Sequence, residues 1–307
     1  MAVFADVGNV DRTTGVYRRG KDDGAVLALQ IGDLDHRNPS SLAESRTMHR
    51  QMKDESRIHG AKFAEHILTK MAVVHVWDDH DYCDNDEDRN CTTRSSAWQA
   101  IEEHWPFYSR PNADAGLWHA FSCGDADVFV LDTRSQRDPN SDTDNASKSM
   151  LDGAGIADDQ KDWLKAGLSG SIKTWKIVVS SVTANTSARP ASDDHWYGGF
   201  STEAAELKNY ITNESIDGVV MVSGDLHTGG GVDDGTNNAW GIPELGTPHT
   251  NLANGNELNL GTWSEGVTAG TNGRNGYGLI TVSSSSLKLD AKASDGTVRH
   301  TLTVSAP

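Results

Sequence analysis

The stretch Val73-Val74-His75-Val76-Trp77-Asp78-Asp79-His80-Asp81 contains the pattern that decides the fold. Its apolar first half is typical of a buried strand, and it leads directly into three carboxylates around one histidine. Ionised carboxylates are costly beside a strand core unless they are paired or bound to metal. Because strand side chains alternate in direction, Asp78 and Asp79 cannot both face the same way, and one of them is predicted to be structural. The segment therefore predicts a strand that ends in a cation-binding site.

Five other apolar runs of strand length also lead into polar residues that can carry chemistry. They are residues 2–5, 26–31, 128–131, 177–179 and 219–222. Helical patterns lie between them, at residues 42–68 (two helices broken near Gly60), 157–168, and 203–211 after Ser201 as a possible N-cap. Strands that alternate with helices favour an α/β layered domain, in which ligands bind at the carboxyl ends of the strands.

The C-terminal part of the chain has a different pattern. Residues 277–282, 287–292 and 297–304 alternate apolar and polar side chains, with Asp295-Gly296 as a hairpin turn. Residues 229–275 are rich in Gly, Asn and Thr and predict long surface loops near the site. Because neither a linker nor an internal repeat divides the 307 residues, we expect a single domain over residues 1–307. Its C-terminal part, at about 277–304, is predicted to be an antiparallel strand meander.

The composition limits the partners. The chain has 44 acidic and 27 basic residues and a formal charge of -17, a field that repels nucleic-acid backbones and anionic membranes. No nucleic-acid partner is therefore expected, and no stretch is long enough to span a membrane. A strand pattern begins at Val3 without a signal peptide before it, which predicts a cytoplasmic protein or the mature form of an exported one. The oligomeric state is left open.

The three cysteines do not form a disulfide-rich framework. Cys83 and Cys91 flank an acidic loop and could pair in an exported protein, whereas free thiols are equally compatible with the sequence. His75 lies inside the strand pattern and is predicted to be a core histidine rather than a ligand.

Acids and histidines at the strand ends form one candidate constellation. Its members are Asp6, Asp33, His36, Asp79, His80, Asp225 and His227. Carboxylate oxygens together with imidazole nitrogens suit two divalent or mixed-valence ions, with Mn, Zn, Fe or Ca as candidates. Two metals about 3.5–4 Å apart can share a bridging carboxylate and hold a hydroxide for in-line attack on phosphorus.

Three short motifs that contain these residues resemble those of a known family. Gly32-Asp33 followed by His36, the run from Asp78 to Asp81, and Gly224-Asp225-Leu226-His227 resemble the motifs of the calcineurin-like metallophosphoesterases. Trp77 to Asp81 leading to Asn85-Asp86 resembles the PhoD-like (alkaline phosphatase D-like) branch. Further stretches fit the same branch: Val130-Leu131-Asp132-Thr133-Arg134, Gln160-Lys161-Asp162-Trp163-Leu164, and His195-Trp196-Tyr197-Gly198-Gly199-Phe200. The resemblance implies a four-layer αββα sandwich of two mixed β-sheets flanked by helices.

The resemblance also implies residue roles. Asp33 would bridge two metals, Asp6 and His227 would bind the first, and Asp79 and Asp225 would bind the second. Asn185 would join the second set through its amide oxygen, and His36, by its spacing from Asp33, is a further candidate ligand. His80 would contact the phosphate or protonate the leaving oxygen as the catalytic residue, and Asp78 or Asp81 would orient it. Arg134 is a weaker candidate for substrate contact, because such an Arg more often makes an internal ion pair.

Two positions depart from the family pattern. Asp6 stands where the branch usually has Cys, and His36 stands where it usually has Tyr. Losing both ligands weakens the case for a ferric ion and favours a divalent pair such as Mn, Zn or Fe(II).

The sequence thus predicts a metal-dependent hydrolase of small phosphoesters, with phosphodiesterase and alkaline phosphomonoesterase activity ranked nearly equal. The alternative is a calcium-loaded secreted binding module without catalysis, which the acidic composition and the nine Trp would allow. Histidines at the strand ends argue against it, because Ca²⁺ prefers shells made only of oxygen.

Overall fold

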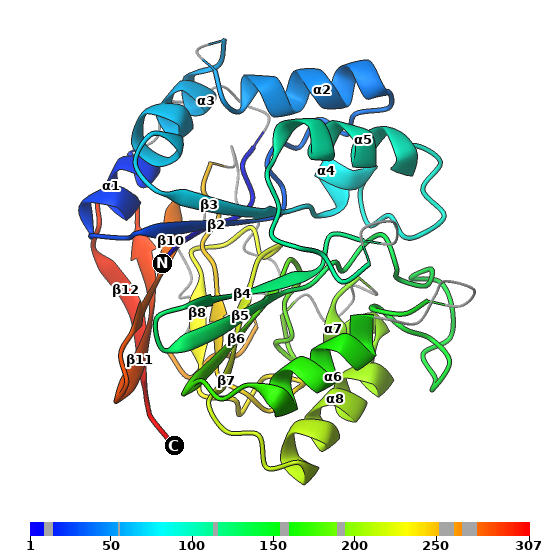
Figure 1. Cartoon of the computed structure of the whole chain (residues 1–307), viewed down its shortest axis with the longest axis vertical. Helices are drawn as coiled ribbons and strands as arrows, with labels where there is room; N and C mark the ends of the chain where they lie inside the picture. Colours follow the sequence, from blue (N-terminus) through cyan, green and yellow to red (C-terminus); the bar gives the residue numbers. More distant parts are fainter. Residues whose placement is uncertain are drawn as a thin grey trace.

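Two six-stranded mixed β-sheets form the centre of the molecule (Figure 1). The computed structural model describes residues 1–8, 15–54, 56–112, 116–153, 160–188, 194–251, 261–265 and 275–307. The strands of the first sheet are, in sheet order, β12 (Val298–Ser305), β11 (Ser286–Ala293), β10 (Gly276–Val282), β1 (Ala2–Phe4), β2 (Leu27–Ile31) and β3 (Ala72–Val76). Those of the second are β4 (His119–Cys123), β5 (Ala126–Val130), β6 (Trp175–Ser180), β7 (Val219–Ser223), β9 (Glu244–Gly246) and β8 (Gly231–Asp233).

Both sheets contain a parallel centre and antiparallel edges. In the first sheet, β1, β2 and β3 are parallel, and β10 joins β1 in the antiparallel sense together with β11 and β12. In the second, β5, β6, β7 and β9 are parallel, with β4 and β8 antiparallel at the two edges.

Helices cover the outer faces of the two sheets (Figure 1). Those on the side of the first sheet are α1 (Val16–Asp22), α2 (Leu42–Gln51), α3 (Ile58–Phe63), the π-helix η1 (Ala64–Leu68), the short α4 (Asp79–Tyr82) and α5 (Arg94–His104). Those on the side of the second sheet are α6 (Gln160–Gly170), α7 (Trp196–Gly199) and α8 (Ser201–Asn213). Two mixed sheets flanked by helices are the architecture predicted above.

The core is divided by the alternation of side chains along the strands. Val3 and Leu29 of the first sheet pack in one apolar cluster with Val179 and Val220 of the second, so this cluster fills the space between the sheets. Val178 points the other way, into a second cluster with Leu164 of α6 and Leu207 of α8. Each central strand is therefore buried on both faces, which explains the continuous apolar runs in the sequence.

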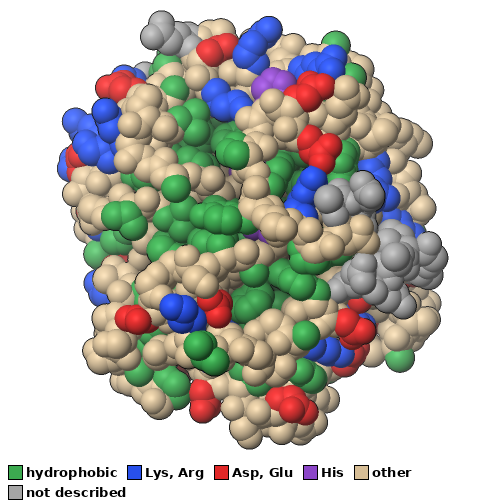
Figure 2. All heavy atoms as spheres, viewed as in Figure 1, with side chains coloured by type: hydrophobic (Ala, Val, Ile, Leu, Met, Phe, Trp, Pro, Cys, Tyr) green, Lys and Arg blue, Asp and Glu red, His purple; other side chains and the backbone are tan. Residues whose placement is uncertain are grey.

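The sandwich core reaches the surface at one edge. Figure 2 shows hydrophobic side chains gathered near the middle of the face seen in Figure 1, where the edge strands β3 and β4 approach each other. Val73 of β3 and Phe121 of β4 are among the partly buried side chains that pack against the core. Charged side chains lie around this apolar area (Figure 2).

The long helical segment divides near Gly60, as predicted, and the break lies before this glycine. α2 ends at Gln51 and α3 begins at Ile58, so Gly60 lies inside α3. A Cβ atom at Gly60 would lie 1.9 Å from the Gln51 carbonyl oxygen. Glycine is therefore needed there for close packing of α3 against the end of α2, and not to end a helix.

Two local predictions change. Ser201 is the first residue of α8 rather than its N-cap, and its hydroxyl donates a hydrogen bond to Asp144 Oδ2 at 2.6 Å. The segment 229–275 contains the buried strands β8 and β9, because β9 extends the second sheet beside β7. Residues 252–260 and 266–274 of this segment, and the predicted start of a helix at residues 157–159, lie outside the described residues.

Cys83 and Cys91 form a disulfide, and Cys123 is a free thiol. Among the described helices, none combines the length and the apolar character that a membrane crossing requires.

Candidate metal centre

The carboxyl ends of the parallel strands bring the predicted residues together. Asp6 follows β1, Asp33 follows β2, Asp78 and Asp79 follow β3, and Asp225 follows β7. The two sheets meet at this end, since a Cβ atom at Gly224 would lie 3.1 Å from Cβ of Ala5. Residues far apart in the chain therefore share one site, as expected for this edge of an α/β sheet.

Among the described residues, four groups of side chains have potential ligand atoms within 4.8 Å of one another. The groups are Asp6 with Asp33, His36 and His227; Asp33 with Asp79 and His80; Asp33 with Asp78 and Asp225; and Asp194 with His195 and Asp225. Asp33 belongs to three of the four, which is the placement that a bridging carboxylate needs. The bridging role itself stays a prediction.

The backbone is unusual where these residues lie. Seven described non-glycine residues have a positive φ, and four of them, Asp6 (φ 54°), Asp33 (φ 48°), Asp225 (φ 54°) and His227 (φ 53°), are candidate ligands. This left-handed conformation is uncommon outside glycine and carries strain, which persists where the surrounding structure requires it. Each sharp turn directs a polar side chain into the site as soon as its strand ends.

His36 is held in the orientation of a metal ligand. Its Nδ1 lies 2.9 Å from the Val7 carbonyl oxygen, and its Nε2 lies 3.0 Å from Asp33 Oδ2. Because a carbonyl can only accept a hydrogen bond, Nδ1 must carry a proton, which leaves Nε2 as the nitrogen that can bind a cation. A backbone carbonyl behind the ring is the usual partner of a ligating histidine.

His227 lies between two carboxylates at distances that suit a shared cation. Its Nε2 is 3.6 Å from Asp6 Oδ1 and also 3.6 Å from Asp225 Oδ1. Both distances exceed the normal length of a hydrogen bond.

The charges at this end of the sheets are poorly balanced by protein groups. Both carboxylate oxygens of Asp6 are buried, and they accept no hydrogen bond from any described residue. Burial, reinforced by the charges of Asp33 and Asp225, raises the pKa of Asp6 well above its ordinary value. Neither Asp6 nor Asp33 has a Lys or Arg partner among the described ion pairs. A bound cation would supply the missing positive charge.

Asp33 and His36 each shift the pKa of the other toward its charged form. Burial opposes ionisation of Asp33, but His36 outweighs it and lowers the pKa of this carboxyl to about 2. Burial also disfavours a charged His36, yet the Asp33 carboxylate raises the pKa of the imidazole well above its usual value. A proton on His36 thus balances Asp33 in the protein alone, and metal binding would displace it.

Asp79 and its neighbours are fixed by backbone donors. Asp79 Oδ1 accepts a hydrogen bond from the His80 N–H at 2.9 Å, and Oδ2 accepts one from the Asp86 N–H at 2.7 Å. Burial raises the pKa of Asp79 well above its ordinary value, as it does for Asp81. Asp81 accepts from the N–H groups of Asp35 (3.3 Å) and Asp78 (3.4 Å), and so fixes the turn into α4. The Nδ1 atom of His80 contacts Asn38 Oδ1 rather than Asp78 or Asp81.

Arg134 makes a buried internal ion network instead of facing the solvent. Its Nε donates to Asp78 Oδ1, and its two terminal nitrogens donate to both Asp194 oxygens, at 2.6 and 2.8 Å. Ser181 donates to the same Asp78 oxygen at 2.7 Å, and Arg137 donates to Asp194 Oδ1 at 2.5 Å. Asp78 is therefore the member of the Asp78–Asp79 pair that contacts Arg134 directly, whereas Asp79 is held by backbone N–H groups and lies 3.9 Å from the nearest Arg134 nitrogen. Burial raises the pKa of Asp78 to about 7 although Arg134 opposes this shift.

Three site residues were not singled out from the sequence. His195 Nε2 lies 2.8 Å from Asp225 Oδ2 and is fully buried, so it supports or joins the ligand set. Asp194 anchors Arg134, and Asn38 contacts His80. The family-like run that begins at His195 was the one available signal, whereas nothing in the local pattern marked Asn38 or Asp194.

Asn185 lies in the loop after β6, and its side chain is engaged in the following turn. Its amide oxygen accepts hydrogen bonds from the N–H groups of Ser187 (3.1 Å) and Ala188 (3.0 Å). Its Nδ2 donates to the Thr262 carbonyl at 2.6 Å. These contacts describe a turn-stabilising residue, and its predicted role as a ligand stays a prediction.

The chain matches a family model over residues 15–249, and that model describes the PhoD-like phosphatases. It belongs to the PhoD-like phosphatase family. This match confirms the resemblance drawn from the motifs at Asp33, at Asp78 to Asp81 and at Asp225 to His227. Family membership, together with the grouped Asp and His side chains, supports a metal-dependent phosphoesterase.

Solved structures show the same fold. PhoD is similar with a TM-score of 0.73 and 19% identity, covering 99% of this chain and 67% of that one. The purple acid phosphatase PPD1 from yellow lupin (Lupinus luteus) seeds is similar with a TM-score of 0.61 and 13% identity, covering 99% of this chain and 53% of that one. The chain thus spans about two thirds of the one protein and about half of the other. A comparison with curated proteins found no match.

Proposed function

We propose that this member of the PhoD-like phosphatase family hydrolyses small phosphomonoesters, phosphodiesters or both with a pair of metal ions. The observation that carries the proposal is the cluster of Asp6, Asp33, His36 and His227, in which two buried carboxylates face two partly buried imidazoles. Among the described ion pairs, neither carboxylate has a Lys or Arg partner. Mixed oxygen and nitrogen donors suit Mn, Zn or Fe(II).

The proposed roles are those that the family motifs imply, and the grouping of Asp33 with the other candidate ligands supports them. Asp6, His36 and His227 would hold one ion, Asp79 and Asp225 would hold the other, and Asp33 would contact both. When bound, the ions would lower the pKa of a coordinated water and neutralise charge on the phosphoryl group. His80, which is half-buried beside Asp33, would hydrogen-bond the phosphate or donate a proton to the leaving oxygen.

The size of a cavity beside the candidate site is relevant to the class of substrate that could bind. A cavity of about 570 Å³ is lined by Arg37, Asn38, Pro39, Ser40, Ala43, Glu44, Thr47 and Met48. Asn38 also contacts Nδ1 of His80, so this cavity lies near the candidate acid. It offers room for the second substituent of a small diester, which keeps both ester classes in the proposal.

The test is hydrolysis of an aryl phosphomonoester and a diaryl phosphodiester before and after metal removal. We expect activity on at least one substrate, loss after treatment with a chelator, and recovery on addition of Mn²⁺, Zn²⁺ or Fe²⁺. Binding of calcium alone, without hydrolysis under any of these metals, would contradict the proposal and favour the non-catalytic calcium-binding alternative.

A further inference from the structure

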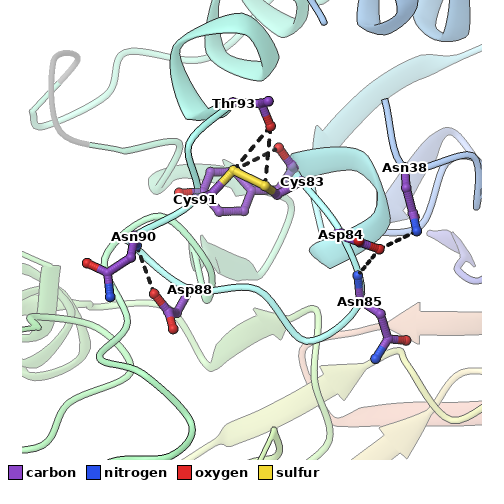
Figure 3. Close-up of a disulfide and its surroundings, with 9 residues drawn as sticks. Asn38, Cys83, Asp84, Asn85, Asp88, Asn90, Cys91 and Thr93 are labelled. Carbon is purple, nitrogen blue, oxygen red and sulfur yellow. Dashed lines mark hydrogen bonds between the residues drawn. A yellow bond between two sulfur atoms is a disulfide. The ribbon is translucent and has the colours of Figure 1, made fainter. Parts of the chain in front are cut away.

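Asn38 connects the candidate acid His80 to a carboxylate in the disulfide loop, defined here as residues 83–91. The Asn38 amide oxygen contacts Nδ1 of His80, and its amide nitrogen donates to Asp84 Oδ1. Figure 3 shows Asn38 and Asp84 joined in this way, with Cys83 and Cys91 closing the loop that carries Asp84. From this chain of contacts we propose that Asn38 and Asp84 are positioning residues that fix the ring of His80 and the nitrogen on which its proton lies.

The donor and the acceptor in both contacts, Asn38 with Asp84 and His80 with Asn38, follow from the chemistry of the groups. An ionised carboxylate can only accept, so the Asn38 amide nitrogen must face Asp84 and its oxygen must face His80. Because an amide oxygen can only accept as well, His80 must carry a proton on Nδ1. Nε2 is then the ring nitrogen that exchanges a proton with the substrate. One carboxylate in a loop thus selects the tautomer of a histidine that it does not touch.

The local backbone is built for this contact. Asn38 has φ 52°, in the left-handed region that Asn tolerates better than most residues. On the other side, Asp84 Oδ1 also accepts the N–H of Asn85 at 2.8 Å, which fixes the carboxylate in its turn (Figure 3). The disulfide between Cys83 and Cys91 limits the movement of this turn. Both ends of the contact are therefore held before a substrate binds.

The loop also holds the neighbouring candidate ligand. The Asp86 N–H donates to Asp79 Oδ2 at 2.7 Å, so the loop contacts Asp79 directly and reaches His80 only through Asn38. Loss of the Asn38–Asp84 contact should therefore affect His80 without removing the donor that holds Asp79. This separation allows a positioning role to be distinguished from general damage to the site.

The first test reads the tautomer directly and does not depend on turnover. Protein labelled with ¹⁵N-histidine and loaded with diamagnetic Zn²⁺ gives a long-range ¹H–¹⁵N spectrum, in which His80 is identified by its loss in His80→Gln. We expect the neutral ring of His80 to be protonated on Nδ1, and to become a mixture of tautomers in Asn38→Gly and Asp84→Ala. Glycine keeps the left-handed backbone at residue 38 available.

Two variants serve as controls for this experiment. Asp84→Glu retains a carboxylate, which can only accept a hydrogen bond, and should keep the parental tautomer. Asp88→Ala removes an acid from the same disulfide loop; Asp88 Oδ1 accepts the Asn90 N–H at 2.8 Å (Figure 3), and the spectrum should again be parental. A parental His80 protonated on Nε2 in its neutral form, or an unchanged spectrum in both Asn38→Gly and Asp84→Ala, would overturn the inference.

The second test rests on the proposed function. If His80 protonates the leaving oxygen, Asn38→Gly and Asp84→Ala should lower kcat about tenfold to hundredfold for alkyl phosphoesters and much less for nitrophenyl esters, whose leaving group needs no proton. Metal content and KM should stay near parental. Equal losses for both esters would contradict the positioning role. If the parental protein hydrolyses neither ester, the proposed function fails, and the tautomer measurement still decides the inference.

Discussion

His80 is the residue on which turnover, rather than metal binding, should depend. Its ring contacts Asn38, and Asp79 beside it lies near Asp33. We expect His80→Ala to keep its metal content and to lose about 10²- to 10⁴-fold in kcat, the usual contribution of an acid–base group. Metal analysis and steady-state kinetics on the same preparation check this. His66→Ala, on the helix η1, is the control, and parental turnover in His80→Ala would refute the role.

At the level of single residues, the sequence located the candidates that directly follow apolar strands. Asp6, Asp33, Asp79 and Asp225 all belong to this class, because a buried run that ends in an acid is visible locally. The partners of these residues were not visible. Arg134 reaches Asp194 across 60 positions and His80 reaches Asn38 across 42, and no local pattern encodes such pairs.

At the level of elements, the disulfide loop should contribute to stability as well as to the site. It closes across a sequence separation of only eight residues, for which chain entropy predicts roughly 2–3 kcal/mol. The double variant Cys83→Ser/Cys91→Ser should therefore unfold at a lower urea concentration than the oxidised parent, with a similar m value.

Reduction of the parent provides the matched comparison for that variant. The reduced parent should behave like the double variant, whereas Cys123→Ser, which removes the free thiol, should leave the midpoint unchanged. Identical midpoints for the oxidised parent and the double variant would contradict the stabilising role.

Element types were predicted better than element ends. Periodicity identified the helical segment at 42–68, but it did not show that α2 ends at Gln51 or that Gly60 packs closely against the Gln51 carbonyl. The strands β8 and β9 are too short to give a periodic pattern in the sequence. They form because β9 pairs with the edge of β7.

At the level of the whole molecule, a buried histidine should make stability depend on pH. His75 lies in β3 with 2% of its surface exposed, and burial lowers its pKa to about 3. In the unfolded chain, His75 has a pKa near 6.5 and binds a proton that it does not bind in the folded chain. The free energy of unfolding therefore decreases as the pH falls below about 6.5. By pH 5 this amounts to about 2 kcal/mol.

Urea unfolding at pH 7 and pH 5 tests the histidine. His75→Gln should lose less stability between these two values than the parent, whatever its stability at pH 7. His49, whose pKa is lowered by burial and by the neighbouring His75, remains in both proteins and accounts for part of the decrease that His75→Gln still shows. An equal decrease in the parent and in His75→Gln would show that His75 is not responsible.

The fold class followed from the strand and helix pattern and from the family motifs, but the sheet assembly did not. The N-terminal strand β1 lies between β2 and β10, and Ala2 pairs with Leu279 near the other end of the chain. Such pairing is decided by packing of the two sheets on a shared core. The candidate site depends on the same packing, because its ligands come together only when both sheets are formed.

The central claim is that Asp33 and its neighbours hold two catalytic metal ions. It is tested most directly by metal quantification on the parent and on Asp33→Asn, a substitution of similar shape that Asn's tolerance of the left-handed backbone allows. We predict about two ions per parental chain, and loss of metal and hydrolysis together in Asp33→Asn, with Asp88→Asn unchanged. Asp33→Asn with parental metal content and parental hydrolysis would contradict the account.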